Sequence, residues 1–190
     1  NQACGTDDID KEKFTKEYFD AIEEKRYERE PEIIEFADFP SAKGKKMLEV
    51  GLGAGTDFIN WVRNGANAYG IDLTNESIAH VKHRLELEGL DANFEVGDSE
   101  NLPFDDNTFE FVYSWGVIHH TPDTPKAFRE IYRVLQSGGK AKIMIYNRKS
   151  MLAYFFWIKH ALLKGKLNLS VDQALFENME SAGTKGYTIE

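Results

Sequence analysis

The chain has 190 residues, of which 42% are hydrophobic and 13% aromatic, which is enough for one folded domain with a sizeable core. This composition excludes general disorder, and a net charge of −9 argues against a surface built to bind the phosphate backbone of a nucleic acid. The single cysteine, Cys4, excludes an intrachain disulfide and a cysteine-based zinc cluster, and it fits a reducing compartment.

No apolar run approaches the roughly 20 residues that a membrane-spanning helix needs. The N-terminal residues N-Q-A-C-G-T-D-D show neither the basic region nor the apolar region of a signal peptide. We therefore predict a cytoplasmic protein without stable membrane insertion.

Residues 10–38 are dense in charge and helical in character. Their apolar residues recur at helical spacing, and Pro31 permits a second helix to begin. We predict a helical N-terminal cap over residues 1–44, and two interpretations of this cap stay open. It is either an amphipathic appendage packed on the domain or a cover over a ligand, with Tyr18 or Tyr27 beside that ligand. The residues that carry the pattern are Phe14, Tyr18, Ile22, Tyr27, Ile33, Ile34 and Phe36.

From residue 45 the pattern changes to strands that alternate with helices. Such alternation predicts an α/β, Rossmann-like, doubly wound fold with a mostly parallel sheet in the strand order 3-2-1-4-5. In a sheet of this kind, ligands bind outside the carboxyl ends of the strands. The predicted strands are residues 47–50, 66–73, 92–96, 109–114 and 140–146; the predicted helices are 57–64, a segment capped by Thr74 or Asn75 and stopped by Gly89, and a helix with Thr124 as its N-cap that ends at Gly138-Gly139.

After Asn147 the alternation stops. Residues 151–163 are apolar apart from Lys159 and His160, and residues 164–190 have the composition of a loop. We predict an apolar helix and loop over residues 149–190. This segment suits a lid at the carboxyl edge of the sheet, but core packing and a homodimer interface are alternatives.

A glycine-rich loop, E-V-G-L-G-A-G-T at residues 49–56, lies between the first strand and the first helix of the alternating region. Glycines allow the backbone to approach a ligand closely, and the helix start offers free N–H groups. The pyrophosphate pattern G-x-G-x-x-G is not met, because residue 56 is threonine. Glu49 lies inside an apolar strand, where a carboxylate is costly unless it is paired, so a cationic ligand group would suit it.

Asp72 ends the second predicted strand, 21 residues after Gly51. A carboxylate at this place accepts hydrogen bonds from both hydroxyls of a ribose in dinucleotide-binding folds. Together with the glycine-rich loop, Asp72 predicts a ligand with an unphosphorylated ribose.

Four stretches in this order resemble the class I S-adenosylmethionine-dependent methyltransferases of the ubiquinone/menaquinone-biosynthesis-like type. They are the glycine-rich loop, Y-G-I-D at residues 69–72, V-G-D-S-E-N-L-P-F at residues 96–104, and S-W-G-V-I-H-H at residues 114–120 with the helix that follows. The resemblance covers about residues 45–148 and implies S-adenosylmethionine as cofactor and S-adenosylhomocysteine as product. It also implies a truncated chain that lacks strands six and seven, with Thr188 capping the helix that would precede them.

The resemblance implies a role for each matching residue. Glu49, Gly51, Gly53 and Gly55 would surround the amino-acid end of the cofactor, and Asp72 would hold its ribose. The adenine would be flanked by Leu73 and bound by the side chain of Asp98 and the backbone of Ser99. Trp115 would face the sulfonium, and Tyr27 of the cap would lie near the cofactor.

His119 and His120 follow Trp115 closely and are candidates for a general base, because histidine exchanges protons near neutral pH. Such a pair also caps backbone groups in many loops. The five histidines show no metal-ligand spacing, so we predict no metal.

We predict transfer of a methyl group by in-line displacement to an oxygen, nitrogen or carbon atom of a small-molecule acceptor. The S-W-G-V sequence stands where relatives that methylate adenine or cytosine amino groups have Asp/Asn-Pro-Pro-aromatic, and Cys4 is far from this region, so a nucleic-acid acceptor is disfavoured. The apolar residues 151–163 favour an apolar acceptor. Two alternatives stay open: a non-catalytic module that binds the cofactor, and a nicotinamide oxidoreductase, against which Thr56 speaks.

Overall fold

Five parallel strands form one sheet in the described part of the chain, in the order β3-β2-β1-β4-β5, as the sequence predicts. The computed structural model describes residues 6, 9–166, 168–178 and 185–188, so Cys4 and any helix over residues 189–190 lie outside the description. The strands are β1 (Lys46–Val50), β2 (Asn67–Asp72), β3 (Asn93–Val96), β4 (Phe109–Trp115) and β5 (Leu135–Met144).

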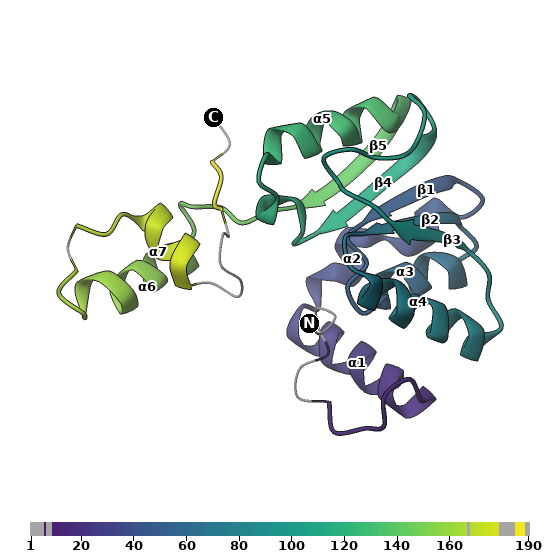
Figure 1. Ribbon diagram of the computed structural model, residues 1–190, viewed down its shortest axis with the longest axis horizontal. Coiled ribbons are helices and arrows are strands. Elements are labelled where there is room, and N and C mark those ends of the chain that lie inside the picture. The colour runs from purple at the N-terminus through teal and green to yellow at the C-terminus, as the bar shows by residue number, and fades with distance from the viewer. Residues whose placement is uncertain (1–5, 7–8, 167, 179–184, 189–190) are drawn as a thin grey trace.

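Helices cover both faces of the sheet (Figure 1). Helices α3 (Thr56–Arg63) and α4 (Asn75–Glu88) lie on one face, and α5 (Thr124–Val134) lies on the other. Thr74 caps α4 by accepting a hydrogen bond from Ser77, and Gly89 ends this helix in the left-handed conformation. The doubly wound architecture is therefore confirmed.

Two boundaries differ from the prediction around α5. The N-cap is Asp123, whose carboxylate accepts from the N–H of Lys126, and Thr124 is already the first helical residue. The helix ends at Val134 because Leu135 pairs with Phe109 as the first residue of β5. A register shift between Phe109 and Phe111 accommodates Gly138-Gly139, so these glycines are an irregularity within β5 and do not end the helix.

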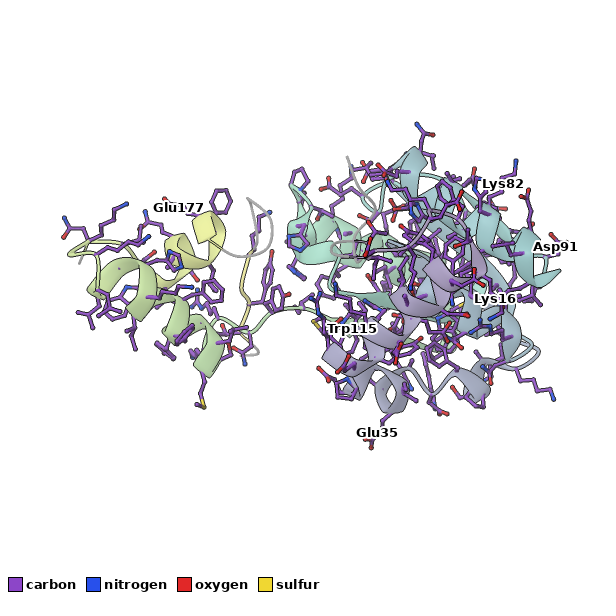
Figure 2. The ribbon with its side chains drawn as sticks, turned by 90° about the horizontal axis from the view of Figure 1, so that it is seen from below. Lys16, Glu35, Lys82, Asp91, Trp115 and Glu177 are labelled. Carbon is purple, nitrogen blue, oxygen red and sulfur yellow. The ribbon has the colours of Figure 1, made fainter. Side chains whose placement is uncertain are left out.

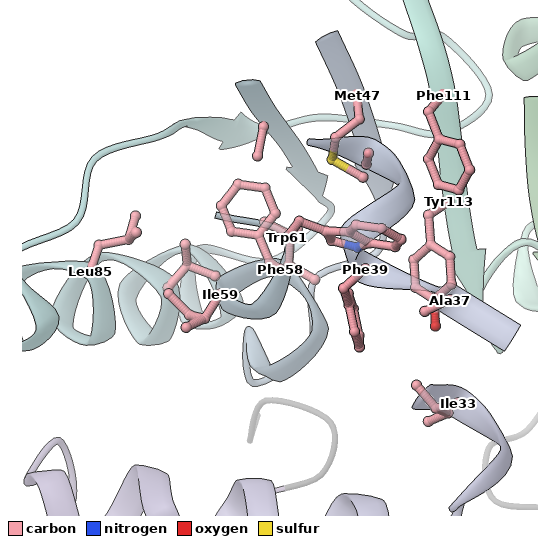
Figure 3. Packing of buried hydrophobic residues seen from close by; sticks show 14 residues of the cluster. Ile33, Ala37, Phe39, Met47, Phe58, Ile59, Trp61, Leu85, Phe111 and Tyr113 are labelled. Atoms are coloured by element: carbon pink, nitrogen blue, oxygen red, sulfur yellow. The ribbon is translucent and has the colours of Figure 1, made fainter. Parts of the chain in front are cut away.

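The main core lies between the sheet and helix α3, which packs on one face of the sheet (Figure 3). Trp61, Phe58 and Ile59 of α3 are fully buried against Met47 of β1 and Phe111 of β4. A second cluster on the other face joins β1, β4 and α5 through residues such as Leu48, Val112 and Ile131. The sheet is thus buried on both sides at its centre, where β1 pairs with both β2 and β4.

The N-terminal residues form α1 (Lys16–Arg29), α2 (Glu32–Ala37) and the short 3₁₀ helix η1 (Phe39–Ala42). Tyr18, Phe19 and Ile22 of α1 are buried against Ala54 in the glycine-rich loop. Ile33 and Ala37 of α2 belong to the main core. The predicted helical character of this region is confirmed, and α1 contacts the loop that precedes α3.

The C-terminal arm, which we define as residues 148–166 and 168–178, stands apart from the sheet beyond the end of β5 (Figures 1 and 2). It contains α6 (Met151–Trp157), the π-helical turn η3 (Ile158–Leu162) and α7 (Val171–Asn178). Among the described helices, none combines the length and the apolar character that crossing a bilayer requires.

The prediction of a loop after residue 163 is wrong for α7. Ser170 accepts a hydrogen bond from the N–H of Gln173 and donates its own N–H to the side chain of Gln173. This reciprocal capping box starts the helix, and its S-x-x-Q signature is present in the sequence.

Beyond the arm, the described C-terminal residues return to the body. Tyr187 donates its N–H to the carbonyl of Tyr146, and Lys185 donates to the carbonyls of Thr121 and Pro122.

Candidate functional site

The predicted ligand-binding residues lie at the carboxyl edge of four neighbouring strands. Because all strands are parallel, their carboxyl ends share one edge of the sheet. Along this edge Asp98 follows β3, Asp72 ends β2, the glycine-rich loop follows β1, and Trp115 ends β4. The structure therefore brings these positions, which spread over residues 49–115 of the sequence, into one row.

The glycine-rich loop needs glycine for reasons of conformation and space. Gly51 has φ = 87°, and a Cβ atom there would lie 2.2 Å from the Cγ2 of Val117. Gly55, the N-cap of α3, has φ = 79°, and its Cβ would lie 2.8 Å from the Cγ2 of Val81. Gly53 also has positive φ. The loop is thus a tight turn that packs on its neighbours and holds the start of α3 at the site.

The carboxylate of Asp72 fastens this loop to the end of β2. Its Oδ2 accepts the N–H groups of Leu52 and Gly53 at 2.8 and 3.1 Å. Its Oδ1 accepts the N–H and the hydroxyl of Thr74 at 2.9 and 2.8 Å. A carboxylate has about four lone-pair sites, so these bonds leave Asp72 no free site to accept a further hydrogen bond. The Thr74 hydroxyl also lies 2.9 Å from Ser77 Oγ, and a turn of its proton toward Ser77 would free one site on Asp72.

Glu49 is buried in β1 with only 3% of its surface exposed. Its Oε2 has no hydrogen-bond partner among the described residues. Burial, and then the negative charge of Asp57, raise the pKa of Glu49 well above its ordinary value. A cation at this place would satisfy the orphaned oxygen, which agrees with the cationic ligand group predicted from the sequence.

Asp57, in the first turn of α3, is the centre of a hydrogen-bond network. Its carboxylate accepts from Nε and Nη2 of Arg26 at 3.0 and 2.6 Å, and from the hydroxyls of Tyr27 and Tyr113, each at 3.1 Å. The Asp57 side chain is 2% exposed, and that of Arg26 is 26% exposed. Burial and the charge of Asp57 raise the pKa values of both tyrosines, so their hydroxyls stay protonated and donate.

A second contact ties the cap to the end of β4. The indole Nε1 of Trp115 donates to Glu30 at 3.0 Å, and the ring of Trp115 packs edge-on against Phe36. Glu30 also pairs with Arg26, which connects this contact to the Asp57 network. The cap thus lies against both the glycine-rich loop and the end of β4. Trp115 lies on the side of the body that faces the C-terminal arm (Figure 2).

The position of Tyr27 agrees with the expected neighbourhood, because its hydroxyl bonds to Asp57 and accepts from Asn60 of α3 at 2.8 Å. Tyr18, the other candidate, bonds instead to His80 of α4 at 3.1 Å. A direct contact between either tyrosine and a cofactor stays a prediction.

The expected adenine side of the site is open to solvent. Leu73 is 73% exposed, which leaves an apolar surface beside the end of β2. Asp98 is exposed, and its Oδ1 accepts the N–H of Glu100 at 2.8 Å, while Ser99 is buried. These residues border the same edge as Asp72, as the resemblance implies, and their contacts with an adenine stay predictions.

His119 and His120 lie in the 3₁₀ helix η2 (Ile118–His120) that follows β4. The His119 side chain is fully buried, and its two ring nitrogens have no hydrogen-bond partner among the described residues. Burial, and then the neighbouring His120, lower the pKa of His119 to about 4. Its ring packs against Tyr146, with 4.6 Å between centroids. His119 is therefore neutral near pH 7 and a weak base, so the structure lends its predicted role as a general base little support.

Asp57, Arg26 and Tyr113 are functional-site residues that the sequence does not predict. An aspartate in the first turn of a helix is common, so Asp57 carries no signal of its buried network. Arg26 lies in a run of charged residues that is typical of an exposed helix face. Only the packing of α1 and of β4 against the start of α3 brings these residues together. In the described part of the chain, no group of three or more His, Cys, Asp or Glu side chains is arranged to hold a metal ion, and the absence of a metal stays a prediction.

Residues 48–143 match the family model described as a methyltransferase domain. The chain is 34% identical over 125 residues to phosphoethanolamine N-methyltransferase 2 of Caenorhabditis elegans, a match that covers 64% of this chain and 28% of the relative. It is 33% identical over 126 residues to norajmaline N-methyltransferase of Rauvolfia serpentina, which covers 63% of this chain and 43% of that enzyme. The chain thus spans less than half the length of these two curated relatives.

A solved structure from Methanococcus maripaludis superposes on the chain with a TM-score of 0.56. The superposition covers 85% of this chain and 80% of that one, at 23% sequence identity. At this identity the likeness supports the fold alone.

We expect Asp57→Asn to lower the free energy of unfolding by about 2–4 kcal/mol, because Arg26 and two tyrosine hydroxyls lose a shared charged acceptor in a buried place. Chemical denaturation measures the change. The matched control is Asp20→Asn, which removes an exposed carboxylate of α1 that pairs with Lys16. This control should leave stability unchanged within error. Equal stability of both variants would show that the network contributes nothing.

We expect the stability of the protein to fall as the pH decreases from about 6.5 toward 4, partly because of His119. In this pH range His119 binds a proton in the unfolded chain but stays neutral in the folded chain. Protonation therefore stabilises the unfolded state relative to the folded state. The contribution amounts to roughly 2 kcal/mol near pH 5. Denaturation at about pH 7 and pH 5 should therefore show a smaller loss for His119→Leu than for the wild type. The same loss in both proteins would contradict the buried neutral state of His119.

Proposed function

Because the chain belongs to the methyltransferase domain family of S-adenosylmethionine-dependent enzymes, we propose that it transfers a methyl group from S-adenosylmethionine to a small-molecule acceptor and leaves S-adenosylhomocysteine. The observation that carries this proposal is the row of Asp98, Asp72, the glycine-rich loop and Trp115 along four neighbouring strand ends. In the cofactor, adenine is followed by ribose and then by the sulfonium, which carries the methyl group and joins the ribose to the amino-acid end.

The donor set fits this cofactor. Glu49 has a buried, orphaned Oε2 that would accept the cofactor's ammonium group. Asp72 would accept one of the ribose hydroxyls once the Thr74 hydroxyl turns toward Ser77. Leu73 offers an exposed apolar surface for the adenine, and Asp98 lies exposed beside it.

When bound, S-adenosylmethionine supplies a methyl group on a positively charged sulfur, which is electrophilic without further activation. The chain's own residues then have to hold the acceptor in line and exclude water, and such positioning supplies roughly 7–11 kcal/mol of the barrier in well-oriented reactions. Trp115, held by Glu30 and Phe36, is a fixed wall at the end of β4 for this purpose. The cap over residues 1–44 would cover the site from the side of α1.

We propose an amine nitrogen as the methylated atom. A neutral amine attacks with its own lone pair, whereas a hydroxyl needs a base to remove its proton. His119 is a poor base because burial lowers its pKa to about 4. The two relatives described above are both named as N-methyltransferases, which supports the same choice.

The acceptor itself is proposed to be a small molecule with an apolar part, not a nucleic acid. The charge of −9 and the S-W-G-V sequence at the end of β4 support this proposal. The C-terminal arm would border the entrance for the acceptor, because β5 delivers the chain to the same edge of the sheet. A cytoplasmic location suits the single cysteine, and a homodimer through the arm stays an alternative use of its apolar surface.

We expect Glu49→Gln to bind S-adenosylmethionine roughly tenfold to a hundredfold more weakly, because a charge-assisted hydrogen bond becomes a neutral one. The folded protein should be at least as stable as the wild type, since a buried carboxyl whose pKa is raised opposes folding as it ionises. Calorimetric titration and thermal unfolding measure the two effects. The matched control Glu86→Gln, at an exposed position of α4, should change neither. Unchanged affinity of Glu49→Gln would mean that the ammonium group is held elsewhere.

The function itself is tested with S-adenosylmethionine that carries a labelled methyl group and a panel of small amines, phenols and carbon acids. We expect label to pass to amines with an apolar part and not to the matching phenols. Binding of the cofactor without transfer to any acceptor would favour the non-catalytic module. Transfer to phenols alone would contradict the amine proposal and point to a base other than His119.

A further inference from the structure

The C-terminal arm presents an apolar stripe to solvent. Its members are spaced as on one face of a helix and are between 42% and 89% exposed, which is far more than large apolar side chains usually are when they form a continuous row. We call this row the arm stripe; it consists of Met151, Tyr154, Phe155, Ile158 and Leu162.

The arm does not use this stripe for its own packing. Ala153 and Ala161, on the opposite side of the same helical segment, are buried, and so are Ala174 and Leu175 of α7. The indole of Trp157 donates to the carbonyl of Leu169 at 2.6 Å and closes the turn between the two helices. The fold of the arm is therefore complete with the stripe still facing outward.

The charge of the arm is opposite to that of the whole chain. Residues 131–171 contain no aspartate or glutamate, although the chain as a whole has a net charge of −9. Among the described residues, the one ion pair formed by the arginine and lysine side chains of the arm joins Arg148 to Asp172 of α7. Four exposed lysines of the arm form no ion pair with a described residue: Lys149, Lys159, Lys164 and Lys166.

We propose that the C-terminal arm binds the surface of a lipid bilayer that contains anionic lipids. The arm stripe would enter the boundary between head groups and acyl chains, and the lysines beside it would contact lipid phosphates. A basic, apolar segment that is too short to span a bilayer lies flat in such an interface. A second copy of the arm fits the stripe less well, because it would bring two sets of unpaired lysines together.

The rest of the chain decides how the protein would lie on the membrane. The acidic body is repelled by anionic lipids, so only the arm approaches them. The arm lies beyond the carboxyl edge of the sheet, on the side of Trp115 (Figures 1 and 2). A protein bound in this way would turn its candidate site toward the bilayer, where apolar small molecules collect. The binding itself does not rest on the proposed methyl transfer.

Flotation of the full chain with lipid vesicles tests the proposal. We expect binding to phosphatidylcholine vesicles with about one third phosphatidylglycerol, at least tenfold weaker binding to phosphatidylcholine alone, and a marked loss of binding at high salt. Replacing Lys159, Lys164 and Lys166 together by glutamine should weaken binding about a hundredfold, since each charge contributes about fivefold. The double variant Phe155→Ser/Ile158→Ser should weaken it at least tenfold.

The control is the double variant Lys82→Gln/Leu87→Ser, which removes an exposed lysine and an exposed leucine from α4. It should bind vesicles like the wild type. All substituted side chains are exposed, so thermal unfolding should show folded proteins throughout, and the lysine variant gives an answer even if the serine variant does not fold.

Three outcomes would overturn the proposal. The first is equal binding to both kinds of vesicle, or to neither. The second is a lysine variant that binds like the wild type. The third is a dimer in sedimentation without lipid that Phe155→Ser/Ile158→Ser converts to monomers, because the arm stripe would then be a subunit interface.

Discussion

The candidate site depends on one buried carboxylate, that of Asp57 at the start of α3. An ionised group with 2% exposure is stable only when charged and polar partners surround it, and here Arg26, Tyr27 and Tyr113 supply them. Two of these partners come from α1 and one from β4. The need to compensate a single charge therefore fixes the cap against the glycine-rich loop and against the end of the central strands.

Glu49 has the opposite situation in the same neighbourhood. It is as deeply buried as Asp57, but one of its oxygens has no partner among the described residues, and the charge of Asp57 adds to the cost of ionising it. The free energy lost by leaving this oxygen unsatisfied is recovered when a cation arrives. The structure thus separates two acidic roles: Asp57 holds the scaffold, and Glu49 is left available for a ligand. Asp72 has an intermediate position, since its carboxylate accepts from the backbone of the glycine-rich loop and, in the proposed function, would also hold the ribose.

The distribution of charge divides the molecule in a second way. Acidic residues dominate the body, whereas the arm beyond β5 is basic and carries an exposed apolar row. The candidate site lies at the edge of the sheet that ends in Trp115, on the side of the arm (Figure 2). The proposed chemistry at the strand ends and the proposed contact with a membrane surface therefore belong to adjacent but distinct parts of one chain.

The sequence by itself determined the alternation of strands and helices, because hydrophobic periodicity is a local property. This alternation predicts the parallel sheet and its strand order, and it places Glu49, Asp72, Asp98 and Trp115 in a row at the carboxyl ends of the strands. It also contained the signal for α7, the Ser170–Gln173 capping box, although the composition of residues 164–190 favoured a loop. Only the tertiary structure decided the partners of Asp57, the burial of His119 and the outward face of the arm stripe. These three features depend on which distant segments of the chain pack together. The sequence around a residue does not show which other segment will contact it.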